Sequence, residues 1–312
     1  MELVEPKLAK CDDRNILPRN NSESGSPEEW FNSRILAENN LLGFNYDFFV
    51  NWQKQPNVVT PVVWIKRIIR GESSDELIRL CTRNDVVSLI ENCELSDYLN
   101  KLARHCFQNK LRLQLLIFRD VDWAKAPEYI IVVEVRWHDD GLKYSISRID
   151  LAEIQERIRL ASGGSVRIGN KGLIYGTSML ECYLSHTDSL YPGDVDLILT
   201  NNEYENIAIL EFKKHNLESS IQAQQLSNYY PRPDGRKYDR LAILRNYLQQ
   251  NPKLIVIYYP TNNTEGAVIE YVSGEAETLV SSDRRTLVLP TKGNNDSYRH
   301  FLNEIIEFVN SI

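Results

Sequence analysis

Two neighbouring segments in the C-terminal half combine apolar residues with acidic and basic side chains. Residues 193–199 have the sequence Gly-Asp-Val-Asp-Leu-Ile-Leu, and residues 207–214 have the sequence Ile-Ala-Ile-Leu-Glu-Phe-Lys-Lys. Both are typical of β-strands, in which residues two apart share a face, so Glu211 and Lys213 project together. If the two strands are adjacent in one sheet, Asp196 comes within reach of Glu211.

These residue types predict a metal site next to a basic group. Two carboxylates that face each other in a partly buried cleft repel unless a cation lies between them, and oxygen ligands favour a hard ion. We therefore expect Asp196 and Glu211 to bind Mg²⁺ or Mn²⁺, which would polarise a phosphate and activate a water molecule. The ammonium of Lys213 can orient that water or offset charge that develops on the phosphate.

The arrangement resembles the PD-(D/E)xK nuclease superfamily, in which an acidic residue lies on one strand and a Glu-x-Lys tripeptide lies on the next. The resemblance covers residues 170–260 and points to the RecB-like and VRR-type branches. It implies that Asp196 is the metal ligand of the first strand, with Asp194 as an auxiliary group. It also implies that the family's helical acidic residue, a further metal ligand, is Glu181.

The resemblance extends to a helix that follows the two strands. The family's Gln-hydrophobic-x-x-Tyr pattern corresponds to Gln225 and Tyr229. Residues four apart share one face of a helix, so both side chains would point towards the metal site or the nucleic acid. The six candidate catalytic residues are Asp196, Glu211, Lys213, Glu181, Gln225 and Tyr229.

Local charge favours a nucleic-acid partner. The whole chain has a net charge of -7, which excludes binding through bulk basicity. Residues 211–245 instead contain seven basic side chains against four acidic ones. This segment predicts contacts with the phosphodiester backbone of a nucleic acid, and we expect DNA rather than RNA. A homodimer or a larger defence or repair complex is compatible with such binding. The expected nucleic-acid-binding residues are Lys214, Arg232, Arg236 and Lys237.

Three alternatives compete with this interpretation. An inactive member of the same fold would bind nucleic acid or a protein and keep the acidic cluster for structure. A two-carboxylate hydrolase such as a glycosidase would need no strand lysine. Asp122, Glu134 and Arg136 imitate the same pattern in the N-terminal half, but we interpret them as structural because a guanidinium substitutes poorly for a compact lysine beside a metal.

The expected fold class is α/β, with a C-terminal PD-(D/E)xK restriction-endonuclease-like core, a central mixed sheet flanked by helices, preceded by an α+β N-terminal region. The expected domains are a mobile leader (1–25), the α+β region (26–150) and the nuclease-like domain (151–312). Hydrophobic periodicity and capping residues predict the following elements. They are a helix from 26 to 36, mostly helix over 59–109, strands at 113–118, 129–137 and 142–149, helices at 151–162 and 173–184, strands at 195–200 and 207–212, a long helix broken by Pro231 and Pro233, a strand at 253–259 and a helix at 297–312.

The remaining composition predicts a soluble cytoplasmic protein with no membrane partner. No apolar stretch approaches the roughly 20 residues that cross a bilayer, and the first 20 residues are too charged for a signal peptide. The five cysteines are odd in number and scattered, without the paired spacing of a zinc site or a redox motif, so we expect reduced thiols.

Overall fold

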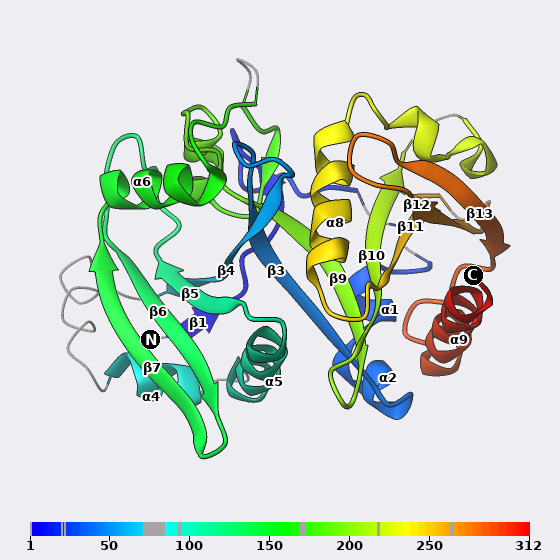
Figure 1. Cartoon of the computed structure of the whole chain (residues 1–312), viewed down its shortest axis with the longest axis horizontal. Coiled ribbons are helices and arrows are strands. Elements are labelled where there is room, and N and C mark those ends of the chain that lie inside the picture. Colours follow the sequence, from blue (N-terminus) through cyan, green and yellow to red (C-terminus); the bar gives the residue numbers. More distant parts are fainter. Residues whose placement is uncertain are drawn as a thin grey trace. The chain divides into compact units, whose positions relative to one another are not determined.

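The computed structural model divides into two compact units (Figure 1). Unit 1 comprises Met1–Pro18 and Tyr46–Gly193, and unit 2 comprises Arg19–Asn45 and Asp194–Ile312. This division differs from the expected boundary at residue 150. The residues that the structure describes are 2–19, 21, 23–70, 85–92, 95–168, 172–216, 219–262 and 265–312.

Unit 1 is built on a mixed sheet with helices packed on it. Its strands follow the order β3-β4-β5-β6-β7, in which β4 and β5 are parallel and β3–β4, β5–β6 and β6–β7 are antiparallel. Strand β1 pairs antiparallel with the end of β4. A separate two-stranded sheet joins β2 to β8. The elements are β1 (Glu2–Val4), β2 (Ala9–Lys10), β3 (Leu41–Asn51, which begins in unit 2), β4 (Val58–Arg70), α4 (Asp85–Glu91), α5 (Leu95–Gln108), β5 (Arg112–Phe118), β6 (Ile130–His138), β7 (Gly141–Ile149), α6 (Leu151–Ser162), β8 (Tyr175–Gly176) and α7 (Met179–Leu184).

The long strand β4 corrects the helical prediction for residues 59–109. Its sequence, Val-Val-Thr-Pro-Val-Val-Trp-Ile-Lys-Arg-Ile-Ile-Arg, is rich in β-branched residues, which pack well on a pleated surface. Trp64 and Ile68 of this strand are buried in one hydrophobic cluster with Ile154 and Ile158 of α6. Residues 71–84, which fall within the segment predicted to be mostly helical, lie outside the described residues.

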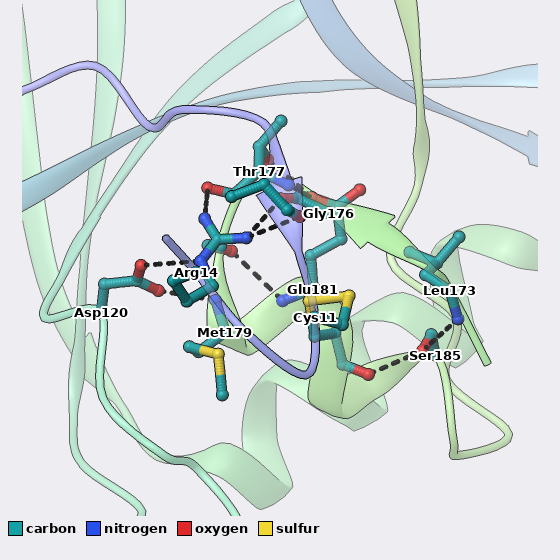
Figure 2. Close-up of a disulfide and its surroundings, with 12 residues drawn as sticks. Cys11, Arg14, Asp120, Leu173, Gly176, Thr177, Met179, Glu181 and Ser185 are labelled. Carbon is teal, nitrogen blue, oxygen red and sulfur yellow. Dashed lines mark hydrogen bonds and ion pairs between the residues drawn. A yellow bond between two sulfur atoms is a disulfide. The ribbon is translucent and has the colours of Figure 1, made fainter. Parts of the chain in front are cut away.

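Residues 2–18, predicted as part of a mobile leader, are held in unit 1 by strand pairing and by a disulfide (Figure 2). Cys11 is bonded to Cys182 of α7, 171 residues away. The guanidinium of Arg14 donates hydrogen bonds to four backbone carbonyl oxygens, including those of Gly176 and Thr177, at 2.6–3.0 Å. The prediction of reduced thiols is therefore wrong for Cys11 and Cys182. Two cysteines that lie 171 residues apart form no spacing motif from which a disulfide could be predicted. Cys106 is a buried free thiol, and Cys81 and Cys93 lie outside the described residues.

The strands of unit 2 follow the order β13-β12-β11-β10-β9, and β3, which begins in this unit, is next to β9 in the same large mixed sheet. β10 and β11 are parallel, whereas β9–β10, β11–β12 and β12–β13 are antiparallel. The elements are α1 (Pro27–Trp30), α2 (Ser33–Glu38), β9 (Gly193–Asn201), β10 (Asn206–His215), the 3-10 turns η1 (Ile221–Ala223) and η2 (Leu226–Asn228), α8 (Gly235–Tyr247), β11 (Lys253–Pro260), β12 (Ala267–Ser273), β13 (Val280–Leu287) and α9 (Asn295–Ser311).

The two faces of this sheet have different neighbours. One face packs against α1, α2 and α9, with Trp30, Phe301 and Leu302 among strand residues such as Leu210 and Ile257. Because side chains alternate along a strand, the intervening residues, including Asp196, Glu211 and Lys213, project from the other face. Helix α8 packs against β11 and starts beside these residues (Figure 1).

The structure confirms α/β as the fold class, with mixed sheets flanked by helices, while the specific nuclease core stays a prediction. The strands at 195–200, 207–212 and 253–259 and the helices at 151–162 and 297–312 are present. The predicted helix over 173–184 is limited to α7, and the one over 26–36 is split into α1 and α2 by Asn32, which caps α2. Among the described residues, none of the helices is long and apolar enough to cross a membrane.

Candidate functional site

The pairing of β9 with β10 brings the two predicted ligands together. In this antiparallel register Leu197 lies opposite Leu210, so the next pair is Asp196 and Glu211. Asp196 Oδ2 accepts a hydrogen bond of 2.8 Å from the backbone N–H of Phe212, which fixes its carboxylate against the neighbouring strand. The sequence prediction that these strands are adjacent is confirmed.

Glu211 is the most deeply buried acidic group of the site. Its side chain is 1% exposed, and that of Asp196 is 18% exposed. Glu211 Oε1 lies 2.6 Å from Lys237 Nζ, which also lies 3.8 Å from Asp196 Oδ1. Glu211 Oε2 accepts no hydrogen bond from any described residue. A buried carboxylate oxygen without a donor is costly, so this atom points to a missing partner.

The charges of this cluster are strongly coupled. Burial raises the pKa of the Asp196 carboxyl well above its usual range, the Glu211 carboxylate raises it further, and Lys237 offsets only part of this effect. Burial lowers the pKa of the Lys237 ammonium, but Asp196 and Glu211 outweigh burial, and the resulting pKa lies well above its usual range. The site therefore attracts positive charge.

Lys213 is held beside Glu211 by groups on three sides. Its Nζ donates a hydrogen bond of 2.7 Å to Asp234 Oδ2 and lies 3.7 Å from Glu211 Oε1. The same atom lies 5.3 Å from the ring centroid of Tyr229 and 5.4 Å from that of Tyr238, distances at which an ammonium is attracted to an aromatic face. The lysine is thus pre-positioned, and its side chain is only 15% exposed.

Tyr229 does reach this site, but not from a helix. The helix predicted around Gln225 is wrong: residues 221–228 form two 3-10 turns, and α8 begins only at Gly235, after the two prolines, which cannot occupy a helix interior. Gln225 is exposed, and the neighbouring Gln224 is buried instead. Its Oε1 accepts a hydrogen bond of 2.8 Å from the Tyr229 hydroxyl.

Sequence reasoning missed Glu270 of β12, which anchors the segment that carries Tyr229. Glu270 is fully buried, and its Oε2 accepts hydrogen bonds from the backbone N–H of Leu226 (2.8 Å) and from the Tyr258 hydroxyl (2.7 Å). The Tyr258 ring stacks on that of Tyr229 at 5.9 Å between centroids. An acidic residue inside the apolar strand sequence Ala-Val-Ile-Glu-Tyr-Val was the available signal.

Glu181 belongs to unit 1, and its carboxylate is bound there. Its Oε2 accepts hydrogen bonds from the backbone N–H and the hydroxyl of Thr177, at 2.7 and 2.6 Å, beside the disulfide (Figure 2). Lys66 Nζ lies 3.8 Å from the same oxygen. Within unit 1, then, Glu181 completes the N-terminal turn of α7, which Ser178 caps.

The residues predicted to bind nucleic acid occupy different environments. Arg232 and Arg236 are exposed at the start of α8, Lys214 is partly buried on β10, and Lys237 lies between the carboxylates. The similar pattern in the N-terminal half forms ion pairs within itself and with a neighbour. Asp122 pairs with Lys125 at 3.0 Å, and Glu134 pairs with Arg136 at 2.6 Å. The described residues contain no group of three or more His, Cys, Asp or Glu side chains arranged to hold a metal.

The arrangement can place a cation at two carboxylates and positive side chains next to it, on one face of a sheet. Neither a protein-family model nor a curated protein matches the sequence, and no solved structure matches the fold. Function must therefore be inferred from these residues and their geometry.

Proposed function

We propose that this chain is a metal-dependent nuclease that hydrolyses phosphodiester bonds of nucleic acid, with DNA favoured over RNA. The observation that carries the proposal is Glu211: a fully buried carboxylate, opposite Asp196 in the strand register, with one oxygen that has no hydrogen-bond donor among the described residues. An apolar residue at this position would destabilise the fold less than a buried carboxylate does. We therefore attribute the carboxylate to function.

The residues present fit a divalent cation. Asp196 and Glu211 offer carboxylate oxygens from adjacent strands, and the orphaned Glu211 Oε2 lacks the positive partner that such an ion provides. These two residues would hold Mg²⁺ or Mn²⁺, which supplies Lewis-acid polarisation of a phosphate and a bound water of lowered pKa. Glu181 belongs to unit 1, where Thr177 already binds its carboxylate, so we assign it no part in holding the ion.

Lys213 supplies the fixed positive charge that phosphoryl chemistry needs. Asp234 and the two tyrosine rings hold its ammonium in place before substrate binds, so little reorganisation is required when negative charge develops on the phosphate. Because this stabilisation grows in the transition state, loss of Lys213 should reduce turnover more than binding.

The backbone of the nucleic acid would be positioned by the exposed Arg232 and Arg236 near the start of α8. Both are close in sequence to Lys237, so phosphate contacts there would lie near the carboxylates. Such contacts carry no sequence information, and binding through them should weaken steeply with salt.

One observation favours a second candidate, an inactive nucleic-acid-binding or protein-binding module of the same fold. Lys237 already provides a positive charge 2.6 Å from Glu211 and 3.8 Å from Asp196. In that interpretation the ion pair would be a structural feature and no metal would be required.

A cleavage assay separates the two candidates. The purified full chain is incubated with end-labelled single-stranded and double-stranded DNA, closed circular DNA and RNA of the same sequence, in Mg²⁺, in Mn²⁺ or in EDTA. The nuclease proposal predicts cleavage with either metal and none in EDTA. Binding to the same substrates without cleavage in any metal would support the inactive module, and equal cleavage in EDTA would exclude the metal mechanism.

A further inference from the structure

Lys237 occupies the position in the cluster where a bound cation would be expected. Its ammonium bridges the two predicted ligands, at 2.6 Å from Glu211 Oε1 and 3.8 Å from Asp196 Oδ1. Lys213 cannot take over this position without giving up its 2.7 Å hydrogen bond to Asp234. The negative charge of the pair is thus balanced mainly by one flexible side chain.

The side chain of Lys237 can move away from the two carboxylates. Lys237 lies in the first turn of α8 and its side chain is 35% exposed, in contrast to the 1% exposure of Glu211. A lysine stem has four rotatable methylene groups and an ammonium that is readily hydrated, so it can turn towards solvent while the helix stays in place. Arg236, the preceding residue, is already exposed on this turn.

We propose that Lys237 is an internal counter-ion that competes with the divalent cation for Asp196 and Glu211, and that it is released towards the substrate phosphate when the cation binds. This inference rests on the proposed function. An ammonium and a divalent cation repel each other at contact distance, so both cannot occupy the same pair of carboxylates. Lys237 would therefore lower the metal affinity of the empty site and strengthen nucleic-acid binding of the filled one.

This exchange couples the two ligands. A phosphate that attracts the released ammonium favours the metal-filled state, so nucleic acid should tighten metal binding and metal should tighten nucleic-acid binding by the same factor. The coupling needs no large movement of the fold, only two positions of one side chain.

The first test measures Mn²⁺ affinity by isothermal titration calorimetry, without substrate, for the wild-type chain and for Lys237→Gln. Removal of the competing charge should tighten Mn²⁺ binding by about tenfold or more. Lys253→Gln is the matched control, because it removes one positive charge from β11, where Lys253 contacts the ring of Tyr271. This control should leave the affinity within about twofold of the wild-type value.

The second test uses the unmodified protein, so it does not depend on whether a variant folds. Reductive methylation with formaldehyde and cyanoborohydride, followed by peptide mass spectrometry, reports how accessible each lysine amine is. Methylation of Lys237 should rise when Mg²⁺ is added, whereas that of Lys253 should not change.

The outcomes distinguish this inference from the proposed function. Tighter Mn²⁺ binding by Lys237→Gln together with metal-dependent methylation of Lys237 supports the exchange. Equal Mn²⁺ affinities in the wild type and Lys237→Gln, or methylation of Lys237 that is indifferent to Mg²⁺ in protein that binds it, overturn the exchange and leave the nuclease proposal standing. Failure of both proteins to bind either metal overturns both proposals.

Discussion

Replacement of Asp196 by asparagine should stabilise the metal-free protein while it removes function. The amide oxygen can keep the hydrogen bond from Phe212 N–H, and Lys237 keeps its closer contact, 2.6 Å, with Glu211. The substitution removes a buried negative charge. The raised pKa of Asp196 indicates that burial and repulsion by Glu211 disfavour this charge more than Lys237 favours it. Relief of this unfavourable burial should raise the free energy of unfolding at neutral pH by roughly 1 to 3 kcal/mol, the usual cost of burying a poorly paired polar group.

The stability of the metal-free protein should depend on pH through Asp196. Because the folded pKa of Asp196 is raised, the folded state binds more protons than the unfolded state above the usual value of 3.8, and stability is lost as pH rises from there. The gain of Asp196→Asn should therefore be largest at neutral pH and shrink towards pH 4.

Urea titrations in EDTA at pH 7.5 and pH 4.5 measure this difference. Asp283→Asn is the matched control: it changes an exposed aspartate on β13 and should shift the free energy of unfolding by less than about 0.5 kcal/mol. A loss of stability in Asp196→Asn at pH 7.5 would refute the reasoning, because it would mean that the carboxylate is kept for the fold.

Three further predictions concern stability away from the two ligands. Cys11→Ser should lower the free energy of unfolding by about 2 to 5 kcal/mol in guanidinium titrations, because the disulfide closes a loop of 171 residues; a reductant should do the same to the wild type. Glu270→Leu should cost about 2 to 4 kcal/mol by the same assay, because Leu226 N–H and the Tyr258 hydroxyl lose a buried acceptor, whereas Glu270→Gln should cost less than half as much. Burial lowers the pKa of His105 from 6.5 to about 3, so stability in urea should fall as pH drops between these values, by up to about 5 kcal/mol, and His105→Leu should remove that slope.

The sequence predicted the structure best where the hydrophobic periodicity and the residue composition indicated the same type of element. The apolar runs of β9, β10 and β11 could be placed because each contains Val or Ile residues, interrupted by acidic positions in β9 and β10 alone. Adjacency of β9 and β10 was enough to predict that Asp196 comes within reach of Glu211, whereas the register, with its irregularity between Asn206 and Ala208, is known only from the structure. Strand β4 carried an equally clear β-branched signal that the helical interpretation of its neighbours obscured.

What could not be predicted depends on contacts distant in sequence. The disulfide joins residues 171 positions apart, and the position of Lys237 between the carboxylates depends on where α8 starts after the prolines. Sequence reasoning placed Lys237 on a nucleic-acid surface, and only tertiary packing shows its ammonium beside Glu211. The role of Glu270 likewise depends on a loop that approaches β12 from 44 residues upstream.

The measurement that tests the nuclease proposal most directly is the single-turnover cleavage rate of end-labelled DNA in Mg²⁺, compared between the wild type, Lys213→Ala and Asp122→Ala. The proposal predicts that Lys213→Ala slows cleavage by about a hundredfold or more while it retains most of its DNA binding. Asp122→Ala, which removes a surface ion pair with Lys125 and a hydrogen bond from the backbone N–H of Ala124, should cleave at the wild-type rate. Wild-type cleavage by Lys213→Ala, with activity lost in a natively stable Asp122→Ala, would contradict the proposal and move the active site to the other half of the chain.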